Sequence, residues 1–193
     1  MDKKALAAFM QGSVPISGPA LDAMLIHFVP RILRKHDFLL QAGHVNNDYF
    51  FLETGCLRAF TLDPAGNEVT TYFYTPERVV FECASFFMRL PSTESIQALT
   101  DCRGYSITYD HLNALFHTIP EGREFGRKML VREFVAFKRL TLALSNQSAD
   151  VRYRQLIETD ATLFQHAPLK YIASYLGITD TSLSRIRREA WRQ

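Results

Sequence analysis

Residues 168–192 read PLKYIASYLGITDTSLSRIRREAWR, and this stretch decides how the rest of the chain is interpreted. Pro168 suits the first position of a helix. Leu169, Ile172 and Leu176 recur at helical spacing until Gly177, a residue that readily adopts the positive φ of a helix end. The stretch therefore predicts a first short helix that ends at Gly177.

A second short helix is expected after a turn of about three to four residues. Either Thr179 or Ser182 can cap its start, and Leu183, Ile186 and Ala190 form one apolar stripe along it. The opposite face carries small polar and basic side chains, namely Thr181, Ser184, Arg185, Arg188 and Arg192. This pattern is typical of a helix-turn-helix, which places its second helix in the major groove of DNA. A surface helical hairpin with merely solvated arginines is the alternative.

The composition is that of a folded globular protein. The chain has 193 residues, of which 47% are hydrophobic, enough for one large or two modest domains. It has no run of about 18 apolar residues, and residues 1–12 lack a convincing signal-cleavage site, so a cytoplasmic protein without a membrane partner is expected. Cys56, Cys83 and Cys102 are far apart and lack C-x-x-C spacing, which favours free thiols over a disulfide or a metal site.

Charge is distributed unevenly along the chain. Residues 1–120 carry a net charge of −3, whereas residues 121–193 carry +5. The basic part is the part with helical periodicity. A cationic C-terminal third suits a polyanionic partner, because neutralising phosphates supplies much of the affinity for DNA.

The N-terminal part has the periodicity of strands. After an expected helix at residues 20–27, short apolar or alternating runs are separated by turn signals such as Asp63-Pro64-Ala65-Gly66-Asn67. This regular spacing predicts an antiparallel barrel or roll. The expected strands are residues 37–41, 49–53, 56–62, 68–74, 79–81, 95–99 and 104–108.

Residues 121–144 predict one long helix, because this stretch lacks proline and its apolar residues follow helical spacing. A helix of about 24 residues extends roughly 36 Å, further than a small barrel. We therefore expect it to pair with a second copy in a two-fold dimer. Packing wholly on its own domain is the alternative. The expected seam consists of Leu130, Phe134, Phe137, Thr141 and Leu144.

The order of these parts resembles the Crp/Fnr family of bacterial transcriptional regulators over nearly the whole chain. FLLQAG at 38–43 and YFFLETGCLR at 49–58 are similar to the family's roll signature, with glycines at its sharp corners. IASYLGIT at 172–179 and LSRI at 183–186 look like its DNA-reading motif. The resemblance implies an α+β fold with three parts: a cyclic-nucleotide-binding-like antiparallel β-roll (a double-stranded β-helix) at 1–116, a dimerisation helix at 117–147, and a helix-turn-helix domain at 148–193.

The resemblance also bears on the effector. Members that bind cyclic AMP carry a Gly-Glu pair for the ribose and an Arg-Ser or Arg-Thr pair, whose arginine holds the phosphate. The matching positions here are Phe81-Glu82 and Ser92-Thr93, so the guanidinium is missing, and Glu94 adds negative charge nearby. We expect no useful cyclic-nucleotide binding. Arg89 is the alternative phosphate ligand if the loop shifts, and any other small-molecule effector is unidentified.

The family's docking geometry assigns roles in the last two helices. It implies base-edge contacts from Asp180, Thr181, Ser184 and Arg185. Phosphate contacts are implied for Lys170, Thr179, Arg187 and Arg188. A strand pair, the wing, usually follows this helix in the family, yet only residues 189–193 remain here, so wing contacts with the DNA backbone are expected to be absent.

The sequence does not favour an enzyme. The six histidines show no H-x-H or H-E-x-x-H spacing, and neither a G-x-S-x-G elbow nor a phosphate loop is present. Asp37, His44 and Asp48 could be considered as a set of metal ligands, but they lie in an expected corner between two strands, where polar residues are usual. We therefore expect no catalytic residues, metal or cofactor, and as partners double-stranded DNA and a second copy. A sensor or interaction module whose helix-turn-helix does not read DNA is the alternative function.

Overall fold

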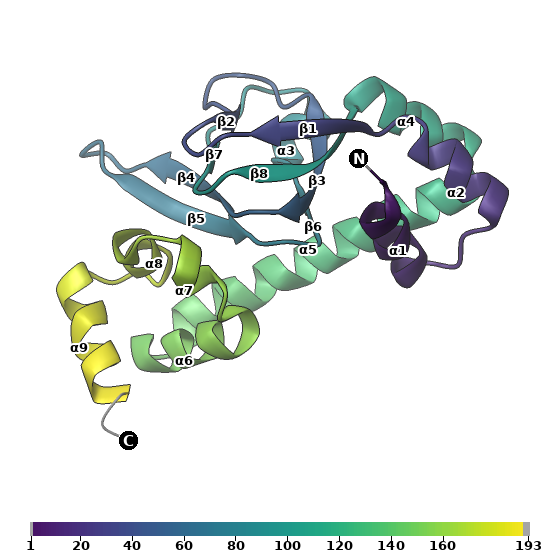
Figure 1. Cartoon of the computed structure of the whole chain (residues 1–193). Helices are drawn as coiled ribbons and strands as arrows, with labels where there is room; N and C mark the ends of the chain where they lie inside the picture. The colour runs from purple at the N-terminus through teal and green to yellow at the C-terminus, as the bar shows by residue number, and fades with distance from the viewer. Residues whose placement is uncertain (1, 191–193) are drawn as a thin grey trace.

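The computed structural model describes residues 2–190. Two antiparallel sheets form a β-roll, the first two helices lie at one end of it, and the C-terminal helices lie at the other end. The long helix α5 runs beneath the roll and joins the two ends (Figure 1). The strands are β1 (Val29–Leu33), β2 (Phe38–Leu40), β3 (Asp48–Thr54), β4 (Leu57–Leu62), β5 (Glu68–Tyr74), β6 (Arg78–Val80), β7 (Ser95–Ala98) and β8 (Cys102–Thr108).

The two four-stranded sheets have the orders β1-β8-β3-β6 and β2-β7-β4-β5. Every pairing within them is antiparallel. Buried side chains from both sheets, among them Phe50, Leu57, Ile96 and Ala98, meet in one apolar cluster. Burial of this shared face holds the sheets together, because removing apolar surface from water is the main favourable term in folding.

The remaining regular elements of the described chain are helices. They are α1 (Lys4–Ser13), α2 (Gly18–Leu25), α3 (Cys83–Met88), α4 (Tyr109–Thr118), α5 (Pro120–Asn146), α6 (Ala149–Asp160), α7 (Leu163–His166), α8 (Leu169–Tyr175) and α9 (Asp180–Ala190). None of these helices combines the length and the apolar character needed to cross a bilayer.

The first half of α5 packs into the N-terminal part of the protein. Pro120 starts the helix, at a position where its missing N–H costs nothing. Phe125 and Met129 are buried with Leu6 and Met10 of α1 in a second apolar cluster. The Phe9 and Phe125 rings meet edge to face at 5.9 Å. This end of α5 is therefore fixed to its own roll.

The structure confirms the expected fold class, an antiparallel roll followed by a long helix and a helical C-terminal part. The predicted runs at 49–53, 68–74 and 104–108 fall on β3, β5 and β8, and the long helix spans 27 residues rather than about 24. Strand β1 was not predicted, and it contains Pro30, a residue that is unusual within a strand. It is tolerated because β1 is an edge strand. Helices α1, α3 and α4 were not predicted either.

Gly104 is where two strands and a ring approach most closely, and it provides a test of the roll. A Cβ at Gly104 would overlap the Phe51 carbonyl oxygen and lie 2.9 Å from the Phe50 ring. We expect Gly104→Ala to lower the free energy of unfolding by about 3 kcal/mol in urea titrations. The control Gly12→Ala, which meets nothing within 4 Å, should leave stability unchanged or raise it by up to about 1 kcal/mol. Equal stability of the two variants would contradict this packing.

Candidate nucleic-acid interface and effector pocket

The turn between α8 and α9 has the geometry that the sequence predicts. Gly177 has φ +67°, a left-handed conformation that favours glycine. Its N–H donates to the Ser174 carbonyl at 3.0 Å, and the Ile178 N–H donates to the Ala173 carbonyl at 3.0 Å. These bonds satisfy carbonyls that the end of a helix would otherwise leave unpaired. The turn thereby fixes the angle at which α9 leaves α8.

Helix α9 starts and packs in a definite orientation. The Thr179 hydroxyl accepts a hydrogen bond from the Ser182 N–H at 3.3 Å, which makes Thr179 its cap. Leu183 and Ile186 are buried in a third apolar cluster together with Ile172 and Ala173 of α8. Since the apolar stripe faces inward, the opposite stripe of α9 must face solvent.

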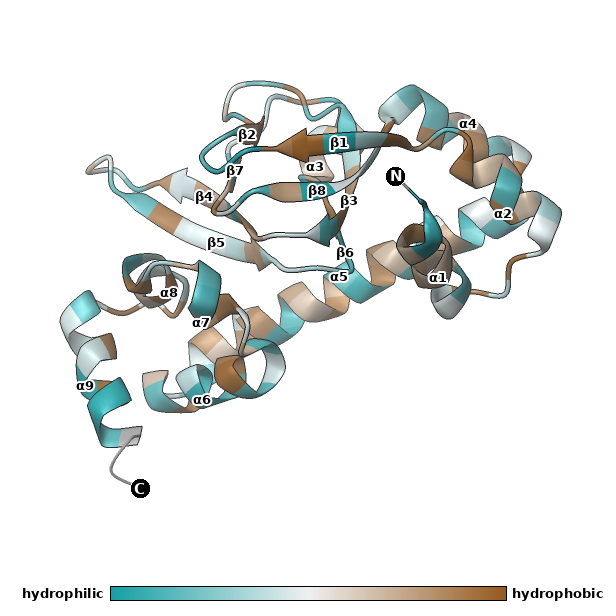
Figure 2. Ribbon diagram, in the orientation of Figure 1, coloured by the Kyte–Doolittle hydropathy of each residue, from teal (hydrophilic) through white to brown (hydrophobic). Residues whose placement is uncertain are grey.

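The predicted base-reading residues Asp180, Thr181, Ser184 and Arg185 are all exposed on α9. Of the predicted phosphate ligands, Lys170, Thr179 and Arg188 are exposed and Arg187 is half-buried. None of these arginines forms an ion pair with a carboxylate in the part of the chain that the structure describes. Figure 2 shows α9 as mostly hydrophilic. Arg192 and the end of the chain, on which the expectation about the wing depends, lie outside the described residues.

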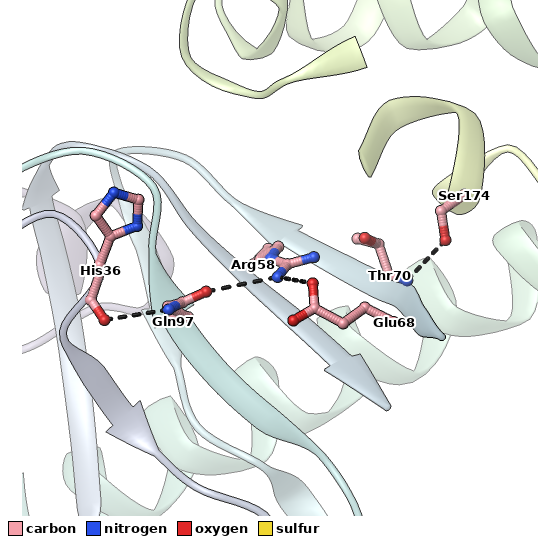
Figure 3. Close-up of polar contacts among 6 residues, drawn as sticks. All are labelled: His36, Arg58, Glu68, Thr70, Gln97 and Ser174. Carbon is pink, nitrogen blue, oxygen red and sulfur yellow. Dashed lines mark hydrogen bonds and ion pairs between the residues drawn. The ribbon is translucent and has the colours of Figure 1, made fainter. Parts of the chain in front are cut away.

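The first helix of the pair, α8, packs on strand β5 of the roll, and it also contacts a buried guanidinium from the neighbouring strand β4. Arg58 of β4 is fully buried, and its guanidinium carbon lies 3.5 Å from the centre of the Tyr171 ring on α8. The same guanidinium pairs with Glu68 and lies 3.5 Å from the Gln97 side-chain oxygen (Figure 3). The phenol ring thus covers a charge that would otherwise face water between the two parts of the protein.

Polar and aromatic contacts extend this docking along β5. The Thr70 N–H donates to the Ser174 hydroxyl at 2.9 Å, as Figure 3 shows. The Thr75 hydroxyl bonds the Asp160 carboxylate at 2.7 Å, and the Phe73 and Tyr175 rings lie 5.3 Å apart. These contacts hold α8 and the end of α6 against the roll and leave the polar face of α9 uncovered by it.

The second half of α5 carries the predicted dimer seam on an open face. Leu130, Phe134, Phe137, Thr141 and Leu144 are all exposed, and the Phe134 and Phe137 side chains keep 66% and 65% of their surface. Hydrophobic bands recur along this helix in Figure 2. Exposing two phenylalanine side chains to water on one face of a helix is energetically unfavourable, so this face is a candidate interaction surface.

A pocket of about 790 Å³ lies between the roll and the second half of α5. Strands β5 and β6 and helix α3 form one wall, and α5 forms the other. Tyr72, Tyr74, Phe81 and Phe87 give it aromatic lining. Its volume is in the range of sites for small organic ligands. Glu133 on α5 also lines the pocket, and sequence reasoning missed it because no local pattern relates residue 133 to the roll.

The predicted effector residues occupy different places around this pocket. Glu82 borders it, but its two carboxylate oxygens accept from the Ala84 N–H at 3.0 Å and the Ser85 N–H at 2.6 Å, so the side chain caps α3. Thr93 lines the pocket, whereas Ser92 is buried and bonds the Glu94 backbone at 2.8 Å.

Arg89, the alternative phosphate ligand, is held outside the pocket lining. Its guanidinium donates to the Asn46 carbonyl at 2.9 Å and to the Asn47 side chain, and it stacks 4.3 Å from the Tyr109 ring centre. Entry of Arg89 into the pocket would require loss of all three contacts. Within residues 2–190, no three His, Cys, Asp or Glu side chains are grouped to hold a metal ion.

Comparison with known proteins agrees with this architecture. Residues 30–118 match the family described as cyclic nucleotide-binding domain. The "transcriptional activator protein anr" of Pseudomonas aeruginosa is 25% identical over 167 residues, which cover 81% of this chain and 68% of that protein. The "anaerobic regulatory protein" of Haemophilus influenzae is 26% identical over 165 residues, which cover 80% of this chain and 63% of that protein. The structure of FixK2 from Bradyrhizobium japonicum has a TM-score of 0.71 at 20% identity, covering 86% of this chain and 85% of that chain.

A β-roll of the cyclic-nucleotide-binding type, joined by a long helix to a helix-turn-helix, defines a class of two-part regulators. In sequence and fold, the chain is similar to regulators of the Crp/Fnr family. The two curated relatives are named as a transcriptional activator and a regulatory protein, which supports a regulatory role. Because this chain spans only about two thirds of their length, its own partners and effector are a separate question.

Proposed function

We propose that the protein is a transcriptional regulator that binds a pseudo-palindromic DNA operator as a homodimer. The observation that carries the proposal is the outward face of α9, where Thr181, Ser184, Arg185 and Arg188 are exposed while Leu183 and Ile186 are buried beneath them. A helix so anchored can enter the major groove without giving up packing, since its apolar stripe stays covered.

The exposed side chains divide by reach and chemistry into two groups. Arg185 has a planar fork of donors that suits the two acceptors of a guanine edge, and Asp180, Thr181 and Ser184 lie beside it as further base-edge contacts. Lys170, Thr179, Arg187 and Arg188 are assigned to phosphates, which position the protein without reading sequence. The base contacts thus supply sequence specificity, and the phosphate contacts supply general affinity for DNA.

The exposed face of α5 supports the dimer. Phe134 and Phe137 would be removed from water by a second copy of the same helix, and both lie on one side of α5 at helical spacing. Two-fold pairing presents two copies of α9, which would meet half-sites about 34 Å apart, or a multiple of this distance.

Arg185 and Lys170 provide a test of the DNA-reading proposal. Arg185→Ala should weaken binding to the cognate operator by about 1 to 3 kcal/mol and relax base preference at one position in each half-site. Lys170→Ala should weaken binding to cognate and scrambled DNA alike, because a phosphate contact carries no sequence information. Both are measured by gel-shift titration on operator fragments recovered by selection from random DNA.

Arg139→Ala is the matched control, since Arg139 is an exposed arginine of α5 in the same basic part of the chain. Its DNA affinity should equal that of the unchanged protein. If no sequence is enriched by the selection, or if Arg185→Ala and Arg139→Ala behave alike, the proposal fails and the interaction-module alternative is favoured.

The seam on α5 gives a second test. Phe134→Asp places a charge where two apolar faces would meet, so the dimer should dissociate to monomers in analytical ultracentrifugation. Arg139→Glu on the opposite side of the same helix should remain dimeric. Because Phe134 is mostly exposed in the single chain, the substitution should leave the thermal unfolding of the monomer nearly unchanged. A dimeric Phe134→Asp variant would contradict the seam.

We also propose that the roll does not respond to cyclic AMP. A cyclic phosphate in this pocket would meet no arginine among the lining residues, and Ser92, at the position of the family's arginine, is buried with its hydroxyl already bonded. Losing a charge-assisted contact of this kind costs about 2 to 5 kcal/mol. Glu82, the residue expected at the ribose, is already engaged as the cap of α3.

Calorimetric titration tests this directly. For both cyclic AMP and cyclic GMP, the dissociation constant should be about 1 mM or higher. A dissociation constant of about 1 mM corresponds to a binding free energy of roughly −4 kcal/mol. Thr93→Arg, which adds a guanidinium at the pocket wall, is the positive counterpart and should strengthen any residual binding. Micromolar affinity of the unchanged protein, abolished by Arg89→Ala, would overturn the proposal and identify Arg89 as the phosphate ligand.

A further inference from the structure

The pocket beside α5 has a one-sided charge. Three of its lining residues carry carboxyl groups, Glu82, Glu94 and Glu133, and no lysine, arginine or histidine lines it. They come from different parts of the chain, with Glu133 on the long helix and the other two on the roll. The potential inside the pocket is therefore set by carboxylates, which disfavours an anionic occupant.

Aromatic rings line the same space. The Tyr72 and Tyr74 rings lie 4.9 Å apart and meet edge to face, and the Phe81 and Phe87 rings meet the same way at 5.9 Å. The face of an aromatic ring carries partial negative charge and attracts cations, most strongly where water is excluded. Rings and carboxylates together attract a positively charged, largely apolar molecule, and they do so independently of each other.

The three acids differ in how far they are already compensated. Both oxygens of Glu82 accept backbone hydrogen bonds at the start of α3. Burial raises the pKa of Glu133 although Arg78 and Arg132 stand nearby and oppose the shift. Burial also raises the pKa of Glu94, where the uncharged Thr71 side chain opposes the shift and Glu82 adds to it, and within the described residues Glu94 forms no ion pair. Glu94 is thus the carboxylate that gains most from a cation beside it.

We propose that this pocket binds an organic cation, an ammonium or phosphonium group carried on an aromatic or alkyl body, with Glu94 and Glu133 as its counter-ions. The aromatic residues Tyr72, Tyr74, Phe81 and Phe87 hold the body of the molecule. This inference assigns the chemistry of the effector and rests on the proposed regulator only for the consequence of binding, not for binding itself.

The consequence follows from the wall that α5 supplies. Phe134 and Phe137 line the pocket and also belong to the exposed seam of α5. An occupant that contacts these rings from the pocket side changes the surface that the second copy meets. The cation is therefore linked to pairing of the two copies, and through pairing to DNA binding.

The test uses two probes of the same shape and opposite charge, tetraphenylphosphonium and tetraphenylborate. Each is titrated by calorimetry into the full-length protein in sodium buffer at pH 7.5. We expect the phosphonium to bind at least tenfold more tightly than the borate, a difference of about 1.4 kcal/mol or more. Equal affinity would mean that apolar contact alone drives binding and would overturn the proposal, and so would the absence of phosphonium binding.

Variants locate the site. Glu94→Gln keeps the size of the side chain and removes its charge, so it should weaken phosphonium binding by about tenfold while leaving borate binding unchanged or stronger. Glu158→Gln, on an exposed face of α6 away from the pocket, is the matched control and should bind like the unchanged protein. Phosphonium binding that Glu94→Gln and Glu133→Gln both leave intact would overturn the assignment to this pocket. The comparison of the two probes on the unchanged protein stands even if a variant fails to fold.

The result of the two probe titrations does not depend on the result of the DNA-binding experiments. Charge-selective binding without any DNA binding would retain the pocket and reject the regulator. DNA binding together with equal affinity for the two probes would retain the regulator and reject the cation.

Discussion

The docking of α8 on strand β5 is the constraint on which the rest of the structure depends. Tyr171 covers the fully buried guanidinium of Arg58, and the Thr70 N–H bonds Ser174 on the same helix. Burial removes water from this guanidinium, and the ion pair with Glu68 and the contact with Tyr171 offset that cost only when α8 is seated in this position. The turn at Gly177 then sets the angle of α9, and its buried stripe decides which face looks outward. Any change that moves the roll against α8 would also turn the exposed face of α9 that we propose reads DNA.

Helix α5 links the other parts because its two halves have different surroundings. Its first half is buried against α1 through Phe125 and Met129, which makes it part of the roll. Its second half exposes Phe134 and Phe137 and also forms one wall of the pocket. One rigid element thus contacts the N-terminal core, the effector pocket and the proposed partner. Phe134 and Phe137 border both the pocket and the proposed dimer seam, so a change in the pocket would reach that seam directly.

The charge of the pocket is set by the side chains that line it and not by the backbone of the roll. The roll keeps a cavity of about 790 Å³ beside the long helix, and such volume by itself is neutral with respect to charge. The side chains decide the sign of the potential. With Arg89 held by Asn46 and Tyr109, and with Glu94 and Glu133 at the walls, the cavity is negative and aromatic. The geometry of the roll and the charge of its pocket are therefore separate properties.

Local sequence determined the parts whose signals are short-range. The end of α8 near Gly177 and the 3.6-residue periodicity of α5 are fixed by neighbours within a few residues, and they could be predicted. The cap of α9 was narrowed to Thr179 or Ser182, and the structure selects Thr179. Tertiary structure alone decided the rest. Pro30 is compatible with strand β1 only because β1 lies at the edge of its sheet. Glu133 lines the pocket only because α5 crosses beneath the roll. Arg58 contacts Tyr171, which is 113 positions later in the chain. Such contacts join residues far apart in sequence, and no local pattern encodes them.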